Sequence, residues 1–158
     1  GAMLAQEKKG LETPSLVKGR LFPIVPCENL LLLDDSYNAN VGSMKSAISV
    51  LQKYSAFRVF VVGDMAELGD NTPLCHQDVG EFAHAAKLDL VISFGRSSSV
   101  ISAVNFGHHF TDKTELVAYL TPIIKQQLTQ QKVVVLVKGS RSMKMEDVID
   151  LLKGNFLC

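Results

Sequence analysis

Short apolar runs alternate with amphipathic stretches along most of the chain. Runs typical of strands lie at residues 20–25, 30–34, 58–62, 88–93 and 133–137, with a weaker one at 107–110. Between these runs, apolar residues recur at steps of three and four, which is the spacing of one face of a helix. Stretches of this kind lie at residues 41–51, 75–86, 100–104, 116–124 and 145–152. The pattern predicts strands that alternate with helices.

Local chemistry adds detail to three of the predicted helices. Asn40 is a candidate N-cap for the first, because its side-chain oxygen can accept from a backbone N–H of the first turn. Thr72 is a candidate N-cap for the second, with Pro73 at the first helical position. Pro122 falls inside the fourth pattern, so that helix is expected to kink or to begin again there.

The strands fix the expected fold. Pro23 and Pro26 lack a backbone N–H, so the run that contains them is predicted to be an edge strand, antiparallel to residues 30–34 through a turn at 27–29. The other runs are apolar on both faces, which is typical of a parallel sheet covered on two sides. We therefore expect an α/β, Rossmann-like fold. Its sheet would be mostly parallel with about six strands, one antiparallel edge strand and helices on both faces.

Composition narrows the class of protein. The chain has 158 residues, 47% of them hydrophobic, and a formal net charge of zero. This length suits one domain, and the neutral charge gives no reason to expect nucleic acid or an anionic membrane as a partner. The apolar runs are too short for insertion into a membrane. Three cysteines without a C-x-x-C pair favour a reducing compartment.

The first residues differ from the rest. Residues 1–18 are polar and begin with Gly1, Ala2 and Met3, which is typical of an expression scar left by a protease. We interpret residues 1–18 as this scar followed by a linker or the tail of a preceding domain. The ordered domain is expected at residues 19–158.

Polar loops follow four of the predicted strands, at residues 34–40, 63–69, 93–96 and 138–142. In open α/β sheets the ligand site lies beyond the carboxyl ends of the strands, so these loops are expected to meet there. Asp34 and Asp35 could form a turn with an Asx hydrogen bond, or accept from a ribose hydroxyl or a cation. Arg20 could be a surface charge or a phosphate contact.

Two absences limit the chemistry. The sequence has neither a G-x-x-x-x-G-K-[ST] loop nor a G-x-G-x-x-G fingerprint, so the chain can supply only part of a nucleotide site. The histidines show no spacing typical of metal ligands, and we expect them to be packing or surface residues. They are His76, His84, His108 and His109. No metal site is expected within this chain.

Four blocks carry a family resemblance. They are residues 18–21, 34–40 (DDSYNAN), 63–69 (GDMAELG) and 138–143 (KGSRSM), the last followed by Met145 and Glu146. In order and spacing they resemble the C-terminal domain of the Mur ligase family, in the branch of UDP-N-acetylmuramoyl-tripeptide–D-alanyl-D-alanine ligases and in a gammaproteobacterial form. The resemblance covers residues 16–158. Val41 departs from it, since many relatives have proline there.

The resemblance implies a cytoplasmic enzyme of peptidoglycan precursor synthesis with three domains. ATP would phosphorylate the terminal carboxylate of UDP-N-acetylmuramoyl-tripeptide, and the amine of D-alanyl-D-alanine would attack the acyl phosphate, with Mg²⁺ balancing the phosphate charge. The N-terminal and central domains, which hold the UDP-sugar and the triphosphate, would be the missing partners of this chain. The chain alone is expected to be inactive.

The same resemblance implies roles for particular residues. Arg20 would be catalytic and contact the γ-phosphate, and Asp35 would accept from the ribose hydroxyls. Tyr37 and Asn38 would line the same pocket. The incoming dipeptide would be bound by Ser140, Arg141 and Ser142. Of these, Arg141 is the candidate for its carboxylate.

Two other classes of protein fit parts of the sequence. A receiver-like phosphoacceptor domain is also doubly wound, and Asp34, Asp35, Asp64 and Lys138 loosely match its layout, with Asp64 as the acceptor. However, glycine follows Lys138 where receivers have proline. A non-catalytic Rossmann-like docking module would leave the polar loops without a role in turnover.

Overall fold

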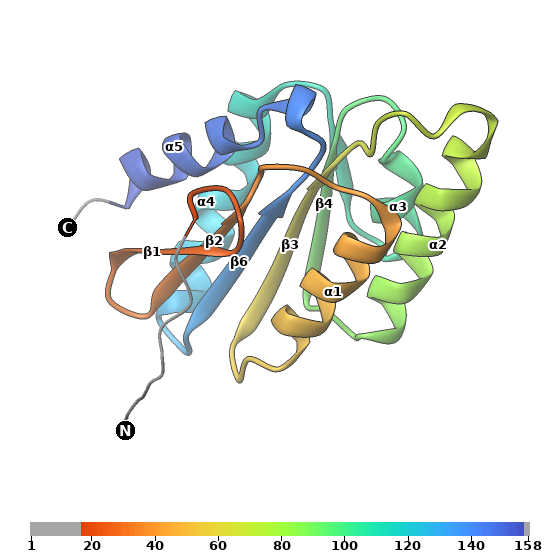
Figure 1. Ribbon diagram of the computed structural model, residues 1–158. Coiled ribbons are helices and arrows are strands. Elements are labelled where there is room, and N and C mark those ends of the chain that lie inside the picture. Colours follow the sequence, from red (N-terminus) through yellow and green to blue (C-terminus); the bar gives the residue numbers. More distant parts are fainter. Residues whose placement is uncertain (1–16, 157–158) are drawn as a thin grey trace, which may run out of the picture.

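The computed structural model describes residues 17–156 and contains one six-stranded sheet in the order β1-β2-β6-β3-β4-β5 (Figure 1). The strands are β1 (Phe22–Cys27), β2 (Leu30–Asp35), β3 (Phe57–Gly63), β4 (Leu90–Phe94), β5 (His108–Phe110) and β6 (Val133–Lys138). The helices are α1 (Val41–Gln52), α2 (Thr72–Ala85), α3 (Ser99–Val104), α4 (Lys113–Leu128) and α5 (Glu146–Asn155). Two short 3₁₀ turns, η1 (Gly69–Asn71) and η2 (Arg141–Met143), precede α2 and α5. Most of the predicted scar and linker, residues 1–16, lies outside the described residues.

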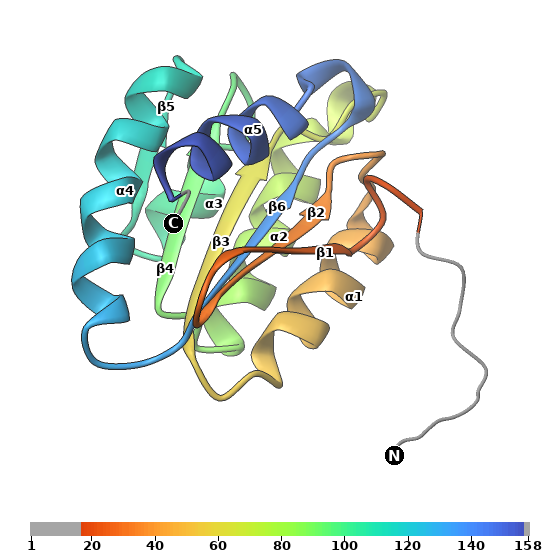
Figure 2. The ribbon, with the colours of Figure 1, turned by 90° about the vertical axis from the view of Figure 1, so that its left-hand side faces the viewer.

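The helices cover both faces of the sheet, as predicted. Helices α1, α2 and α3 lie on one face, and α4 and α5 lie on the other (Figures 1 and 2). Within the described residues, all neighbouring strands except β1 and β2 pair in parallel. The predicted α/β fold with one antiparallel edge strand is confirmed, and so is the weak sixth strand, β5.

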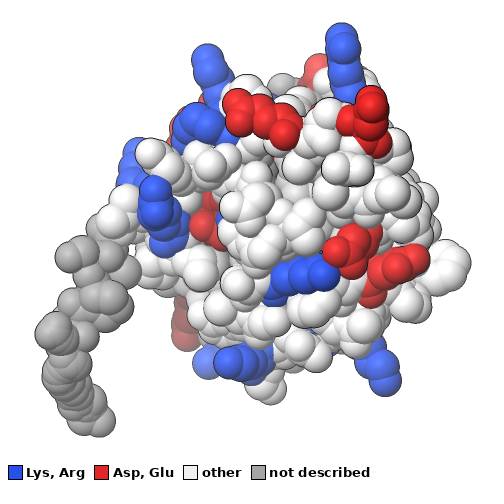
Figure 3. Space-filling view, turned by 45° about the vertical axis from the view of Figure 1, so that its right-hand side comes forward, with Lys and Arg blue, Asp and Glu red and all other residues white. Residues whose placement is uncertain are grey.

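Charged side chains of both signs are spread over the surface. Neither sign forms a continuous patch on the face shown in Figure 3. Some opposite charges pair, such as Lys45 with Asp78 at 2.9 Å, but their side chains are about a third and a half exposed. Exposed pairs of this kind contribute little to stability. No helix within residues 17–156 is long and apolar enough to cross a membrane.

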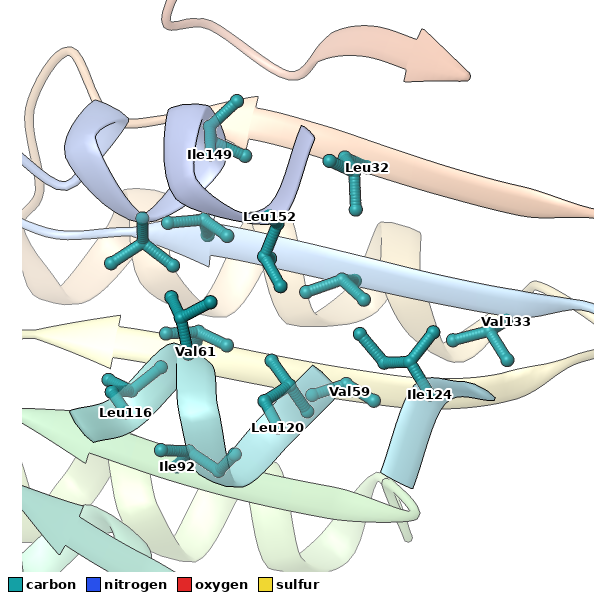
Figure 4. Close-up of a cluster of buried hydrophobic side chains, with 14 of the residues drawn as sticks. Leu32, Val59, Val61, Ile92, Leu116, Leu120, Ile124, Val133, Ile149 and Leu152 are labelled. Carbon is teal, nitrogen blue, oxygen red and sulfur yellow. The ribbon is translucent and has the colours of Figure 1, made fainter. Parts of the chain in front are cut away.

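The central strands supply the core on both sides, because successive side chains of a strand point to opposite faces. Val59 and Val61 of β3 pack toward α4 and α5, in the cluster that Figure 4 shows. Phe60 and Val62 pack toward α1 and α2 on the other face. This double burial explains why the runs read as continuously apolar in the sequence.

The start of β1 differs from the prediction. The strand begins at Phe22 and not at Arg20, because the preceding residues form a turn: Gly19 and Leu21 have φ of 87° and 49°. A positive φ is incompatible with an extended strand. From Phe22 onward, β1 pairs antiparallel with β2 at the edge of the sheet, as the prolines predicted. The turn places Arg20 beside the carboxyl end of β2.

Of the predictions made for the helix starts and for Pro122, the structure confirms some and contradicts others. The Asn40 cap is confirmed: Asn40 Oδ1 accepts from the Ser43 N–H at 2.8 Å, and Ser43 Oγ accepts from the Asn40 N–H at 2.9 Å. The Thr72 cap is wrong, because the helix already begins at Thr72 and its hydroxyl donates to the Gly69 carbonyl of η1. Helix α4 continues through Pro122 without beginning again. Both Pro122 and Ala118, whose carbonyl loses its usual partner, are exposed, so water can hydrate that carbonyl.

Replacing Asn40 with alanine tests the cap. The change leaves the Ser43 N–H without its side-chain acceptor, and we expect the free energy of unfolding to fall by about 1 kcal/mol. Urea unfolding of the chain followed by circular dichroism measures this. An Asn40→Asp variant, which keeps an acceptor oxygen, should retain nearly all of the stability. Equal losses in both variants would contradict the cap.

Candidate functional site

The carboxyl ends of β2, β3, β4 and β6 lie at one edge of the sheet, the upper edge in Figure 1. Strand β6 lies between β2 and β3, so the loop that follows it adjoins the loops after both. Gly139 permits this close approach, since a Cβ there would lie 3.1 Å from the Gly63 Cα and 2.8 Å from the Met145 Cγ. The Ser140 N–H then donates to the Asp64 carbonyl at 2.9 Å.

Two adjoining clefts open among these loops. The first, here called the Asp35 cleft, has a volume of about 430 Å³ and is lined by Arg20, Leu21, Asp35, Tyr37, Asn38, Asn40, Ser43, Ser46, Ala47 and Lys138. The second, the Ser140 cleft, has a volume of about 720 Å³ and is lined by Tyr37, Asn38, Ala39, Asn40, Ala66, Glu67, Leu68, Ser140, Arg141 and Ser142. The clefts share Tyr37, Asn38 and Asn40.

Arg20 and Tyr37 form one wall of the Asp35 cleft. The guanidinium carbon of Arg20 lies 4.2 Å from the centroid of the Tyr37 ring. The backbone supports this contact, since the Tyr37 N–H donates to the Gly19 carbonyl at 2.8 Å. An arginine stacked on a ring keeps a planar set of N–H donors, which suits recognition of phosphate oxygens. The structure therefore brings these two predicted site residues together.

Asp35 lines the same cleft. Its Oδ1 accepts from the Leu21 N–H at 3.1 Å, and its Oδ2 accepts from the Lys138 ammonium at 2.8 Å. Lys138 also donates to the Asn38 carbonyl at 3.0 Å. Asp35 is 8% exposed and Lys138 is 3% exposed, so this ion pair is buried. The carboxylate is therefore held in place where it lines the cleft.

Asp34 does not act with Asp35 as an acceptor pair. It is 1% exposed, and its Oδ1 accepts from both the N–H and the hydroxyl of Ser36, at 3.1 and 2.5 Å. This is the Asx turn that the sequence left open as an alternative. Of the two aspartates, Asp35 alone lines one of the two clefts described above.

The three residues predicted to bind the substrate all line the Ser140 cleft. Ser140 and Ser142 have their hydroxyl oxygens 3.2 Å apart. The guanidinium of Arg141 donates to the Ser36 carbonyl at 3.3 Å and pairs with the carboxylate of Glu146. Arg141 is thus exposed but already oriented, with Glu146 at the start of α5 as its counter-ion.

Asp64 has a structural role. Its carboxylate accepts from the backbone N–H groups of Arg96, Ser97 and Ser98, at 2.8, 3.0 and 2.9 Å. It thereby holds the loop between β4 and α3. The preceding Gly95 has φ of 123°, and a Cβ there would lie 2.5 Å from Asp64 Oδ1. A carboxylate with three backbone donors is poorly placed to act as a phosphoacceptor.

His76 is a packing residue, as expected. It is fully buried, and its Nε2 accepts from the Met65 N–H at 3.0 Å. Since Nε2 accepts, Nδ1 carries the proton and donates to the Thr72 carbonyl at 2.7 Å. This neutral ring fixes the loop that contributes Ala66, Glu67 and Leu68 to the Ser140 cleft.

The carboxylates at this edge do not fit a Mg²⁺ ion. The Asp35 carboxylate is paired with the Lys138 ammonium, whose positive charge opposes a bound cation. The carboxylates of Asp34 and Asp64 accept two and three hydrogen bonds from the protein. Nor does the described part of the chain contain any group of three or more His, Cys, Asp or Glu residues that could hold a metal. Any Mg²⁺ in the reaction would need ligands from elsewhere.

Sequence reasoning missed several residues of the clefts. Lys138 begins the polar loop whose later residues are assigned to the dipeptide, yet its ammonium lies in the Asp35 cleft. One signal was available: a lysine that closes the all-apolar strand VVVLVK needs a buried partner. The Asp35 cleft is also lined by Asn40, Ser43 and Ser46. Of these, the sequence predicts a role only for Asn40, as a helix cap and not as a cleft residue.

Comparison with known proteins shows the family to which the chain belongs. The family model described as Mur ligase, glutamate ligase domain, matches residues 19–141. The chain belongs to the Mur ligase family, as its C-terminal domain. The receiver-like alternative is therefore wrong, in agreement with the structural role of Asp64.

The relatives point to one member of the family. The chain is 58% identical to the UDP-N-acetylmuramoyl-tripeptide–D-alanyl-D-alanine ligase of Haemophilus influenzae over 159 residues, which is 100% of this chain and 35% of that protein. Identity to the Escherichia coli ligase of the same name is 52%, over 100% of this chain and 34% of that one. The chain thus spans about a third of the length of these relatives.

Solved structures of MurF ligases have the same fold over most of this chain. One crystal structure of MurF from Acinetobacter baumannii matches with a TM-score of 0.82 and 34% identity, covering 92% of this chain and 32% of that one. MurF ligase from Thermotoga maritima, in complex with ADP, matches with a TM-score of 0.77 and 25% identity over 93% of this chain and 32% of that one.

Proposed function

We propose that this chain is the C-terminal domain of a cytoplasmic, ATP-dependent ligase that joins D-alanyl-D-alanine to UDP-N-acetylmuramoyl-tripeptide in peptidoglycan synthesis. Relatives of this name match the whole chain at 58% and 52% identity. The observation that carries the proposal is that the residues assigned to the nucleotide all line one cleft, and those assigned to the dipeptide all line the next.

The Asp35 cleft would receive the nucleotide. Asp35 would accept from the ribose hydroxyls, with Tyr37 and Asn38 beside it. Arg20 would contact the γ-phosphate and stabilise the charge that moves during transfer. The triphosphate and Mg²⁺ would be held by the two thirds of the relatives' length that this chain lacks, since the chain has no phosphate-binding loop.

The Ser140 cleft would receive the dipeptide. Arg141 would exchange part of its contact with Glu146 for the dipeptide carboxylate, which suits a planar guanidinium. Ser140 and Ser142 would add hydroxyl donors and acceptors. Because the two clefts share three residues, nucleotide and dipeptide would lie next to each other, as the reaction needs.

The chemistry would proceed in two steps. The terminal carboxylate of the tripeptide attacks the γ-phosphorus, which forms an acyl phosphate and releases ADP. The dipeptide amine then attacks the acyl carbon, so that the C–N bond forms, the C–O bond to phosphate breaks, and phosphate and a proton leave. Water would hydrolyse the acyl phosphate, so the domain must close over it. Alignment of the amine with the acyl carbon would lower the activation free energy by up to about 7–11 kcal/mol. The chain alone would therefore be inactive.

Replacing Asp35 with alanine in the full-length ligase tests the proposal. The variant loses the acceptor for the ribose, and we expect kcat/KM for ATP to fall about tenfold or more, measured by coupled release of ADP. An Asp150→Ala variant removes an exposed carboxylate that lines neither cleft and serves as the control. Near-normal turnover of the Asp35 variant would favour the docking module instead.

A further inference from the structure

Lys138 is a buried lysine that lines the Asp35 cleft. It ends β6, where its backbone is in register with Asp35 of β2 and Val62 of β3. Burying an ammonium group is costly unless the charge is paired and hydrogen-bonded. On the basis of the proposed function, we propose that Lys138 is a positioning residue that fixes the Asp35 carboxylate for the ribose.

The contacts of the ammonium group support a positioning role. It lies 2.8 Å from Asp35 Oδ2 and 3.0 Å from the Asn38 carbonyl oxygen, so it joins the end of β2 to the loop that follows. The backbone continues from Lys138 through Gly139 into Ser140 and Arg141, which line the other cleft. The Lys138 side chain thus connects residues that line the Asp35 cleft to the start of the loop that lines the Ser140 cleft.

The burial of this pair sets it apart from an ordinary surface ion pair. The side chains of Lys138 and Asp35 are 4% and 12% exposed. In the Lys113–Asp147 pair, which has a similar distance of 2.9 Å, the corresponding values are 18% and 52%. A surface pair of that kind exchanges readily with water, whereas the buried pair holds its geometry.

The fixed carboxylate still has room for a ligand. An ionised carboxylate offers about four lone-pair sites on its two oxygens. The Leu21 N–H takes a site on Oδ1, and Lys138 takes a site on Oδ2. A site therefore remains on each oxygen, which suits the two neighbouring hydroxyls of a ribose. Without Lys138, the carboxylate loses one of these two donors, and its rotation is no longer fixed at both oxygens.

The test uses the full-length ligase and three nucleotides: ATP, 2′-deoxy-ATP and 3′-deoxy-ATP. Loss of a hydroxyl that bonds to a charged group should raise KM about tenfold for the wild-type enzyme. Lys138→Met should raise KM for ATP by about the same factor. The ratio of KM for each deoxynucleotide to KM for ATP, here called the discrimination, should then fall to about twofold or less. KM for the dipeptide should stay within about threefold of the wild-type value. Lys138→Arg, which keeps the charge, should preserve most of the discrimination.

Two controls make the outcomes decisive. Lys113→Met breaks an exposed lysine–aspartate pair that lines neither cleft, and it should leave all three KM values unchanged. Lys138→Met leaves the buried Asp35 carboxylate without its charged partner, which can destabilise the fold. The thermal midpoint of this variant is therefore measured as well. If that variant fails to fold, the Lys138→Met/Asp35→Asn double variant, which removes both charges, carries the test. Its discrimination should equal that of Asp35→Asn alone.

The results separate the two proposals. If Asp35→Asn keeps the discrimination against the deoxynucleotides, the ribose contact of the proposed function is wrong. If Asp35→Asn loses it and Lys138→Met keeps it, with all three KM values raised equally, Lys138 has a purely structural role and this inference is overturned. A double variant with less affinity than Asp35→Asn alone, for all nucleotides, also overturns it.

Discussion

Replacing Arg20 with alanine in the full-length ligase is expected to lower kcat by about 10³-fold, because arginines that contact the transferred phosphoryl group contribute roughly 10³–10⁵ in related reactions. The lower end applies because Arg20 is exposed in this domain. Under the proposed function, it would become desolvated only on closure of the domain over the nucleotide. The contact with Tyr37 already orients the guanidinium in this domain, so we expect the loss to fall on the transition state. Single-turnover release of ADP measures the effect.

Two further variants define the source of this loss. Arg20→Lys keeps the charge but not the planar donors, and it should recover part of the rate. Arg96→Ala removes an exposed arginine that lines neither cleft, and it should turn over normally. A kcat for Arg20→Ala within about tenfold of the wild-type value would rule out a catalytic role for this residue.

Replacing Phe60 with alanine is expected to lower the free energy of unfolding by about 3–5 kcal/mol, because it leaves a large cavity in the core. Phe60 is fully buried on β3, between β6 and β4, and packs under α1 and α2. For a domain of this size the thermal midpoint should fall by about 6–20 °C. Scanning calorimetry or urea unfolding of the 158-residue chain measures it.

The matched control is Phe106→Ala. Phe106 is 87% exposed, so its removal should change the free energy of unfolding by about 0.5 kcal/mol or less. A fall of less than about 2 °C for Phe60→Ala would show that β3 is not at the centre of the core. Because this measurement needs no substrate, it tests the fold separately from the function.

The apolar patterns predicted the fold well because burial on both faces leaves a direct trace in the sequence. Strand β3 illustrates this, since each of its central residues is fully buried. The errors arose where backbone geometry or surroundings decide. The positive φ of Leu21, which moves the start of β1, is unusual for a leucine and has no local signal. The 3₁₀ turn η1 likewise moved the cap away from Thr72.

The candidate site was predictable in position but not in detail. Asp35 follows a strand in a parallel sheet, so its place at the carboxyl edge could be foreseen. Its pairing with Lys138, about a hundred residues away in sequence, depends on β2 and β6 being neighbours, which no local pattern shows. The different fates of Asp34 and Asp35 also follow from strand geometry, because successive side chains point to opposite faces.

The arrangement of the clefts explains why this domain would need the rest of the protein. Both clefts are open to solvent. Transfer of a phosphoryl group requires positioning from several directions and exclusion of water. A second surface that carries the phosphate-binding loop would complete both requirements.

A crystal structure of the full-length ligase with a non-hydrolysable ATP analogue tests the central claim most directly. It should place Asp35 within hydrogen-bond distance, about 2.7–3.2 Å, of a ribose hydroxyl, and the Arg20 guanidinium at a similar distance from the γ-phosphate. An analogue bound fully within the other domains, with the Asp35 cleft turned away from it in the closed enzyme, would contradict the proposed role of this domain.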